Sequence, residues 1–546
     1  MKKKILSAAF AALLALPTWA CTNMIVGKNA STDGSVIVSY AADSYGMFGE
    51  LAHFKAGTHA DGEMVDIYEW DTGRYLGKIA QAKQTYNVIG NINEYQLTIA
   101  ETTWGGRPEL QDTTAIIDYG SLIYLALQRS RTAREAIKVM TSLVQEYGYY
   151  SEGETFTIAD PNEVWMMDMI GKGPGIRGAV WVAVRIPDDC VACHANQSRI
   201  RQFSLNDKEN CLYAPDVITL AREKGYFSGV NKDFSFADAY CPLNFGGLRY
   251  CEARVWSFYN MFADDAASYL DYAKGDASAK PMPLYWKPNR KVSVRDIQQA
   301  MRDHYEGTPL DISQDFGAGP YKAPYRLTPL SFKVDGESYF NERPISTQQT
   351  SWVFVSQMRA QLPDAVGGVL WFGMDDANLT VFTPMYCCMT EAPLCYTHPD
   401  GADICTFSWN SSFWVFNWVS NMAYQRYSLL IDDIRQTQQG LEETLALAQE
   451  GIESTALKLL QSDAAKGKAF LTNYSVQSAQ HTLNAWKKLG EYLIVKYNDG
   501  TIRPTENGKF KRGANGMQLN PIRVGYPEEF LKEYIKQTGE RYKMPK

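Results

Sequence analysis

The composition of this 546-residue chain is that of a globular protein, with 45% hydrophobic and 21% charged residues. It argues against extended disorder, and the length allows a large buried core in one extended domain or in several. The net charge of -7 argues against a nucleic-acid partner, because binding to phosphate groups requires concentrated Lys and Arg side chains.

Residues 1–20 are predicted to form a secretory signal peptide. Lys2 to Lys4 supply its positive start, Ile5 to Leu16 its apolar stretch, and Thr18 to Ala20 a cleavage site of the small-x-small type. The apolar stretch is too short to span a bilayer of roughly 30 Å, and no later segment is predicted to cross a membrane. We therefore expect an exported protein, periplasmic or extracellular, whose first residue is Cys21.

A lipoprotein signal also ends just before a cysteine, so lipid attachment is the competing interpretation of Cys21. Such signals usually carry Leu three residues upstream of the cysteine, where this chain has Thr18, and the bulky Trp19 follows. These two residues favour a cleavage that leaves a free amino group on Cys21.

A β-hairpin is predicted at the start of the mature chain. Apolar and polar residues alternate over Thr22 to Val26, the turn residues Ser31 to Gly34 follow, and the pattern resumes at Val36. Folding about this turn brings the start of the first strand beside the end of the second. Cys21 and Asp43 are therefore expected to be neighbours.

The later elements mix strands and helices. Hairpins are predicted around Asn93-Glu94 and around Asp160-Pro161-Asn162, strands over Ala179 to Ile186 and Gly367 to Phe372, and helices over Leu122 to Tyr147, near Val294 to His304 and over Asn417 to Leu493. This order predicts a layered α+β fold rather than a parallel βαβ fold. We expect a catalytic domain over residues 21–416 and a helical C-terminal region over 417–546 that packs on it.

An amino-terminal cysteine carries a nucleophile and a base on one residue. A free α-amine has a pKa of about 7.7 to 8.0 and a thiol one of about 8.5, so proton transfer from sulfur to nitrogen is feasible near neutral pH. The same chemistry is impossible while Ala20 is attached to Cys21, because an amide nitrogen is not a base. Removal of the signal peptide would therefore couple export to activation.

The mature chain resembles the dipeptidases of peptidase family C69 over nearly its whole length. Its opening carries the resemblance, in Cys21-Thr22-Asn23-Met24-Ile25-Val26-Gly27-Lys28 and in Asp43-Ser44. The order of the matching segments is specific, although no single motif decides. The other segments are Ala30 to Ser35, Asn93-Glu94, Arg185 to Asp189, His194 to Gln197, Arg302 to Thr308, Glu342 to Gln349, Gly367 to Gly373 and Lys496 to Gly500.

The resemblance implies the αββα sandwich of N-terminal nucleophile hydrolases and the hydrolysis of dipeptides without a metal or an organic cofactor. By position, Cys21 would attack the scissile carbonyl, Asp43 would orient the α-amine, and Asn196 would donate a hydrogen bond to the oxyanion, with Asn93 as a weaker candidate for that role. The more distant penicillin V acylases and bile salt hydrolases make an amidase the nearest alternative activity.

One departure from the family pattern concerns the residues before Asp43. Family members often have Arg-Asn-x-Asp, whereas this chain has Tyr40-Ala41-Ala42-Asp43. The cation that would lower the pKa of the thiol is thus missing from this segment. Arg185 and Arg343 are the candidates to replace it.

The ten cysteines allow other interpretations. Export predicts that most of them are paired in disulfides. Cys190-Val191-Ala192-Cys193-His194 has the C-x-x-C-H pattern of covalent haem attachment, so an exported haem or redox protein is the alternative from a different class. A zinc site among Cys387, Cys388, Cys395, Cys405 and His398 is disfavoured by irregular spacing.

Two further possibilities remain open at this point. The chain could be a surface binding protein that keeps the fold without the activity, and a homo-oligomer is compatible with the sequence. Dipeptides are the expected partners, with no nucleic acid.

Overall fold

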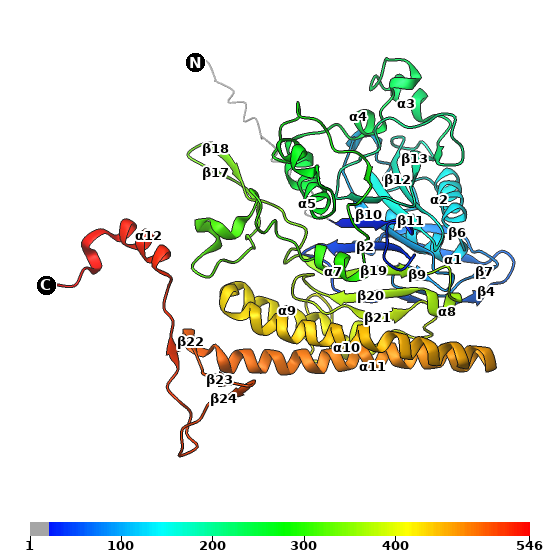
Figure 1. Cartoon of the computed structure of the whole chain (residues 1–546). Coiled ribbons are helices and arrows are strands. Elements are labelled where there is room, and N and C mark those ends of the chain that lie inside the picture. Colours follow the sequence, from blue (N-terminus) through cyan, green and yellow to red (C-terminus); the bar gives the residue numbers. More distant parts are fainter. Residues whose placement is uncertain (1–20) are drawn as a thin grey trace, which may run out of the picture.

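The computed structural model describes residues 21–546, and two antiparallel β-sheets form its centre (Figure 1). The predicted signal peptide lies outside the described residues. The first sheet has seven strands in the order β16-β14-β1-β2-β19-β20-β21. The second has eight strands in the order β15-β13-β12-β11-β10-β9-β8-β3.

The strands of the seven-stranded sheet are β1 (Thr22–Val26), β2 (Val36–Asp43), β14 (Val191–His194), β16 (Tyr285–Trp286), β19 (Thr350–Met358), β20 (Val369–Met374) and β21 (Thr383–Tyr386). Those of the eight-stranded sheet are β3 (His53–Phe54), β8 (Val88–Ile89), β9 (Ile92–Asn93), β10 (Thr98–Thr103), β11 (Glu154–Ala159), β12 (Val164–Gly171), β13 (Ala179–Ile186) and β15 (Cys211–Tyr213).

Helices cover the outer face of each sheet. α1 (Tyr119–Arg129) and α2 (Ala133–Tyr147) share a hydrophobic cluster with the eight-stranded sheet. α9 (Ser412–Gln425), α10 (Tyr427–Ser462) and α11 (Ala464–Lys496) pack on the seven-stranded sheet, where α10 and α11 run side by side (Figure 1). The layers therefore follow the order helix, sheet, sheet, helix.

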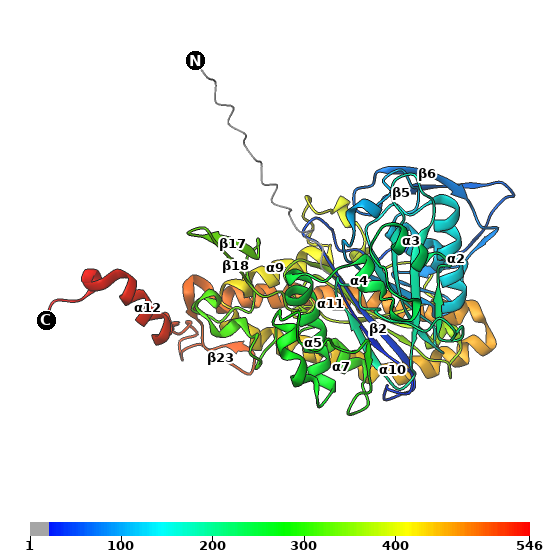
Figure 2. The ribbon, with the colours of Figure 1, turned by 90° about the horizontal axis from the view of Figure 1, so that it is seen from above.

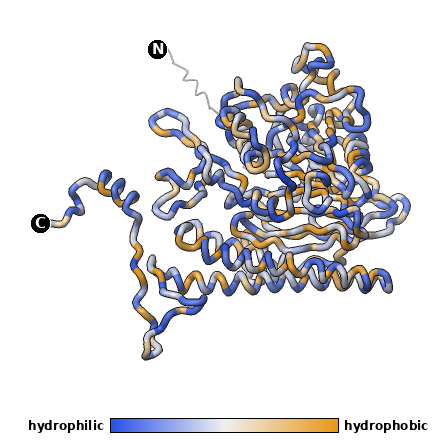
Figure 3. Tube along the Cα trace, in the orientation of Figure 1, coloured by the Kyte–Doolittle hydropathy of each residue, from blue (hydrophilic) through white to orange (hydrophobic). Residues whose placement is uncertain are grey.

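Neighbouring side chains of β19 show that the two sheets face each other. Ser356 hydrogen-bonds Thr98 of the other sheet at 2.7 Å, whereas the next residue, Gln357, accepts a hydrogen bond from Gln449 of α10 at 3.4 Å. Because successive side chains of a strand point to opposite faces, Ser356 marks the interior of the sandwich and Gln357 its outside. Hydrophobic stretches gather in this strand-rich centre (Figure 3).

The predicted first hairpin is confirmed. β1 pairs with β2 in a register that sets Thr22 opposite Ala41, so Cys21 lies beside the end of β2. The turn is stabilised by Asp33, whose carboxylate accepts hydrogen bonds from the backbone and hydroxyl groups of Ser35. Gly34 adopts a φ of 79°, which a residue without a Cβ takes without strain.

Other predictions are confirmed or corrected. The hairpin at Asp160 to Asn162 joins β11 to β12, and the strand over Ala179 to Ile186 is β13. The helix predicted over 122–147 is two helices, because Thr132 caps the start of α2. The prediction of a single hairpin around Asn93-Glu94 is wrong in detail. Three strands follow one another there, because β9 pairs with β8 on one side and with β10 on the other.

The region between the two halves of the seven-stranded sheet is largely helical and irregular. Helix α5 (Ala253–Phe262) contacts β14, and helix α7 (Val294–Ala300) contacts β19. Four short α-helices lie elsewhere in the body of the protein: α3 (Val217–Glu223), α4 (Phe236–Tyr240), α6 (Leu270–Ala273) and α8 (Asp364–Gly367). Small two-stranded sheets are formed by β4 (Gly57–Thr58) with β7 (Gln84–Thr85), by β5 (Met64–Tyr68) with β6 (Tyr75–Ala80), and by β17 (Ser331–Val334) with β18 (Glu337–Phe340).

The last part of the chain departs from the expected helical region. Helix α11 ends at Lys496, and the chain then leaves the body as an arm that carries α12 (Glu528–Thr538), as Figure 2 also shows. No residue of α12 is buried. The arm also contains β22 (Thr501–Ile502), β23 (Thr505–Glu506), β24 (Lys509–Phe510) and β25 (Ile522–Arg523). None of the helices in residues 21–546 combines the length and the hydrophobicity that a membrane span requires.

Candidate active site

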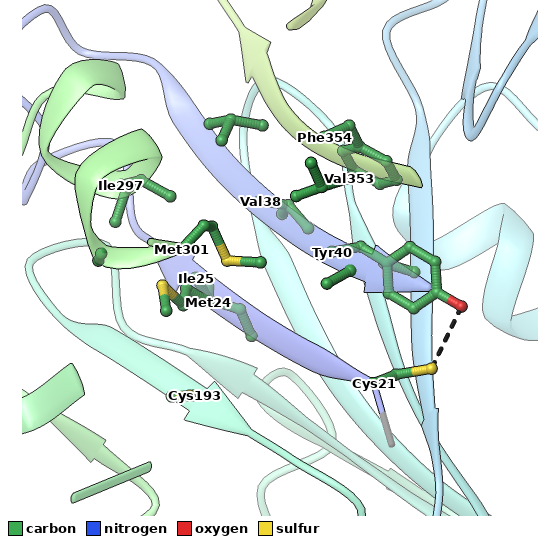
Figure 4. Close-up of a cluster of buried hydrophobic side chains, with 14 of the residues drawn as sticks. Cys21, Met24, Ile25, Val38, Tyr40, Cys193, Ile297, Met301, Val353 and Phe354 are labelled. Carbon is green, nitrogen blue, oxygen red and sulfur yellow. Dashed lines mark hydrogen bonds between the residues drawn. The ribbon is translucent and has the colours of Figure 1, made fainter. Parts of the chain in front are cut away.

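Cys21 lies directly before β1, at the end of the sandwich where β2 also ends. Its side chain is 6% exposed, and its Sγ lies 3.5 Å from the hydroxyl of Tyr40 (Figure 4). That hydroxyl donates a hydrogen bond of 2.6 Å to Oε1 of Glu101 on β10. The thiol is therefore connected through one hydroxyl group to a buried carboxyl of the other sheet.

The surroundings of Cys21 keep its thiol protonated. Burial, together with the negative charges of Glu101 and Asp43, raises the pKa of the thiol well above its usual range. The hydrogen bond with Tyr40 and one with the backbone of Asp43 lower this pKa, but they do not outweigh burial. Activation of the sulfur therefore requires a base beside it.

Asp43 ends β2 next to Cys21 and is held by two donors. Arg343 donates to Oδ2 at 2.5 Å, and the hydroxyl of Thr350 donates to Oδ1 at 2.6 Å. Burial raises the pKa of Asp43, although Arg343 and Thr350 lower it. Both carboxylate oxygens thus have a fixed orientation at the amino-terminal end of β1.

Arg343 brings a guanidinium to Asp43, although no arginine is among the main causes that set the pKa of the Cys21 thiol. Its side chain and that of Asp43 are 4% and 0% exposed, so the ion pair is buried. Arg185, the other candidate, instead pairs with Glu163 and Asp188 at the far end of β13. At the position where the family often has arginine, Tyr40 contacts the thiol.

Asn196 follows β14 and is joined to Cys21 by Arg254 of α5. Arg254 donates to Oδ1 of Asn196 at 2.9 Å and, through its other terminal nitrogen, to the carbonyl oxygen of Cys21 at 2.7 Å. Asn196 donates to the carbonyl oxygen of Thr103 at 2.6 Å. Because a side-chain amide has two N–H groups, a second donor remains on Asn196.

Asn93 has a different role. Its amide donates to the carbonyl oxygens of Leu127 and Ser130 at 2.7 and 2.8 Å, and its Oδ1 accepts from the backbone of Tyr95 and Leu97. Both amide hydrogens are therefore engaged in joining the end of α1 to the turn after β9. Within residues 21–546, no hydrogen bond connects Asn93 with Cys21, Asp43 or Asn196.

A family model described as peptidase family C69 matches residues 20–62 and 64–440, which is more than half of the chain. The chain belongs to peptidase family C69. The match begins next to Cys21 and includes Asp43, Asn196 and Arg343, so the residues that meet at the end of β1 all lie within it.

Similar proteins carry dipeptidase names. A "Probable dipeptidase" of Salmonella dublin is 27% identical over 386 residues, which cover 67% of this chain and 81% of that protein. A "Probable dipeptidase" of Latilactobacillus sakei is 26% identical over 504 residues, which cover 87% of this chain and 95% of that protein. "Dipeptidase A" of Lactobacillus helveticus is 24% identical over 442 residues, which cover 76% of this chain and 85% of that protein. These names and the family support a peptide hydrolase.

In this C69 peptidase the C-x-x-C-H segment is an interior strand and does not fit haem attachment. His194 of β14 is fully buried, and its two ring nitrogens hydrogen-bond the hydroxyls of Thr102 and Thr157, each at 2.7 Å. Neither nitrogen is available to a haem iron. Burial and the nearby Arg199 lower the pKa of His194 to about 3, so the ring is neutral.

The prediction that most cysteines form disulfides is wrong for this structure. All ten cysteines lie within residues 21–546 and all are free, nine of them buried. Cys193 lies on β14, and Cys190 directly precedes that strand. Export determines the redox compartment of a protein but not the distances between its thiols.

Four residues of the site were missed by reasoning from the sequence: Tyr40, Glu101, Arg254 and Thr350. Glu101 left a signal, because it is a charged residue inside the short strand Thr98–Thr103, every residue of which is buried. Arg254 is a similar case in the apolar helix α5. Tyr40 and Thr350 left none, since aromatic and β-branched residues are ordinary in strands.

Proposed function

We propose that this C69 peptidase is an exported cysteine-type dipeptidase whose nucleophile is Cys21, freed as the amino-terminal residue by removal of residues 1–20. The observation that carries the proposal is the convergence of Asp43, Arg254 and Asn196 on the residue that precedes β1. The helix-sheet-sheet-helix order supports an N-terminal nucleophile hydrolase fold, in which the first strand carries the nucleophile at its start.

The base in this proposal is the α-amine of Cys21. No imidazole hydrogen-bonds the thiol among the described residues, and the thiol is protonated, so the amine is the base that the chemistry needs. Asp43, held by Arg343 and Thr350, orients that amine. The amine takes the thiol proton, and the sulfur attacks the carbonyl carbon of the peptide bond.

The tetrahedral intermediate collapses to a thioester on Cys21 as the protonated amine gives its proton to the leaving amino group. Water, deprotonated by the same amine, then attacks the thioester and releases the acid. The free N–H of Asn196 is the proposed donor to the oxyanion, and Arg254 holds Asn196 in place through its Oδ1. Asn93 is not part of this proposal, because its donors are engaged elsewhere.

The test begins with the full chain expressed with residues 1–20 in a bacterium that exports it. Mass spectrometry of the exported protein is expected to find Cys21 as a free first residue, and a dipeptide panel is expected to be hydrolysed. Cys21→Ala should abolish hydrolysis, whereas Cys405→Ala, a change at the exposed cysteine, should not alter it. A different first residue, an acylated amine or an active Cys21→Ala protein would refute the mechanism.

A further inference from the structure

Two neighbouring buried carboxyl groups, one of them beside the thiol, have no role in the proposed mechanism. Glu101 of β10 and Glu154 of β11 are 2% and 0% exposed. One oxygen of each is used, since Glu101 accepts from Tyr40 and Glu154 accepts from Thr103, at 2.6 and 2.7 Å. The second oxygen of each is buried without a well-formed hydrogen bond, and the side chains of Glu154 and Cys21 lie close to Glu101.

No cation of the described chain pairs with these two carboxyls. Neither takes part in an ion pair within residues 21–546, and a hydrogen bond between the two side chains allows them to share a proton. Burial and the charge of Glu101 raise the pKa of Glu154 well above its usual range, and burial raises that of Glu101. Buried carboxylates without a counter-charge are costly, so a proton or a cation must accompany the pair.

A third acid extends the negative charge toward the surface. Asp71, on the loop between β5 and β6, is partly exposed and accepts a hydrogen bond of 2.9 Å from the hydroxyl of the buried Tyr119. Its pKa is raised to about 7, chiefly by burial and in part by the charge of Glu101. Asp71 in turn contributes to the raised pKa of Glu154. Asp71, Glu154 and Glu101 therefore influence one another electrostatically, and Glu101 in turn acts on the thiol.

The covalent geometry of a dipeptide puts its amino group close to this charge. The amino nitrogen of the first residue is about 2.5 Å from the carbonyl carbon that the sulfur attacks, because only the α-carbon separates them. A group that recognises this nitrogen must therefore adjoin Sγ of Cys21. Asp43 already holds Arg343 and Thr350 and orients the α-amine of Cys21 in the proposed mechanism, whereas Glu101 beside the thiol has a second oxygen without a well-formed hydrogen bond.

We propose that Glu101 and Glu154 bind the protonated α-amino group of the substrate, and that this contact restricts the enzyme to peptides with a free amino terminus. The inference rests on the proposed function and specifies its substrate class. An ammonium group has three N–H donors, two of which would meet the unused oxygens of the pair, and it supplies the missing positive charge. At neutral pH most α-amino groups carry that proton.

The experiment compares hydrolysis of Ala-Ala with that of N-acetyl-Ala-Ala by the processed enzyme. The wild-type kcat/KM should favour the free dipeptide by at least about 100-fold, and Glu101→Gln and Glu154→Gln should each lower this preference by about 30-fold or more, since each removes a buried charge partner. Glu152→Gln is the matched control: this partly exposed acid has no charge among the causes of its raised pKa, and the preference should stay unchanged.

The outcomes separate the two proposals. A wild-type enzyme that hydrolyses neither substrate refutes the proposed function, and the inference with it. A wild-type enzyme that hydrolyses both equally well, or variants that slow both substrates by the same factor, would overturn the inference alone, because a purely structural role does not distinguish the substrates. N-acetyl-Lys-Ala tests the other source of an ammonium group: a Glu101-dependent preference for it would also overturn the assignment to the α-amine.

Should either Gln variant fail to fold, binding to the Cys21→Ala protein provides the second measurement. Ala-Ala is expected to bind at least about 30-fold more tightly than N-acetyl-Ala-Ala by calorimetry. Equal affinities would contradict the proposed ammonium site without any need for turnover.

Discussion

Arg343 reaches Asp43 across 300 positions of sequence and forms a buried ion pair with it at 2.5 Å. Asp43 ends the second strand of the chain, whereas Arg343 belongs to the segment that leads into β19. The pair thus connects the hairpin that begins at Cys21, the proposed nucleophile, to the centre of the same sheet.

Arg343→Ala should destabilise the protein strongly, because it leaves the Asp43 carboxylate buried without its counter-charge. We expect a loss of about 3 kcal/mol in the free energy of unfolding, measured by urea denaturation. Arg185→Ala is the control, since Arg185 forms partly exposed pairs and should cost less than about 1 kcal/mol. Equal losses in the two variants would show that the buried ion pair contributes no more to the free energy of unfolding than the partly exposed pairs of Arg185 do.

Replacement of Asn196 should affect turnover more than substrate binding. Loss of the proposed oxyanion donor in Asn196→Ala is expected to lower kcat by about 100- to 1000-fold with little change in KM. Asn196 has a φ of 60°, which glycine tolerates and alanine does not, so Asn196→Gly should be more stable than Asn196→Ala by about 1 kcal/mol. Steady-state kinetics that find full kcat in both variants would rule out the assignment.

Asn93→Ala tests whether the side-chain amide of Asn93 stabilises the fold or takes part in catalysis. Four backbone hydrogen bonds of a fully buried side chain disappear, so we expect a loss of about 2 to 4 kcal/mol in unfolding free energy. The kcat per folded molecule should remain that of the unmodified enzyme. A fall in kcat without loss of stability would instead indicate that Asn93 donates a hydrogen bond to the oxyanion.

His194 should make the protein less stable in acid. Its pKa in the folded state is about 3, below the ordinary 6.5, so between these values the unfolded chain binds a proton that the folded chain does not. The free energy of unfolding is therefore unaffected by His194 above pH 6.5, and it falls by about 1.4 kcal/mol per pH unit as the pH decreases from 6.5 toward 3. Denaturation curves at several pH values should show a shallower dependence for His194→Gln, and identical slopes would contradict the assignment.

Contacts that are local in sequence were predictable. The turn residues Asp33 and Gly34, with the alternation on either side, were enough to place Cys21 beside Asp43. Local signals also located the hairpin of β11 and β12, through the turn residues Asp160 to Asn162, and β13, through its continuous apolar run before Pro187. The family resemblance added Asn196, which by its residue type alone is an ordinary turn residue.

Contacts that depend on how the two sheets pack were not predictable. Glu101 meets Tyr40 only because β10 of one sheet crosses the end of β2 in the other, and Arg254 reaches Cys21 from a helix 233 positions away. No periodicity within either segment contains that information. The choice of Arg343 over Arg185 likewise required the structure, since both are arginines in segments that match the family pattern.

Strand β1 is an interior strand, with residues Asn23 to Val26 paired to β14 on one edge and to β2 on the other. The carbonyl oxygen of Cys21 is also tethered, by Arg254. In the proposed maturation, Cys21 would already be held in place before residues 1–20 are removed, so the cleavage would break one covalent bond and would require no rearrangement of the backbone that follows it.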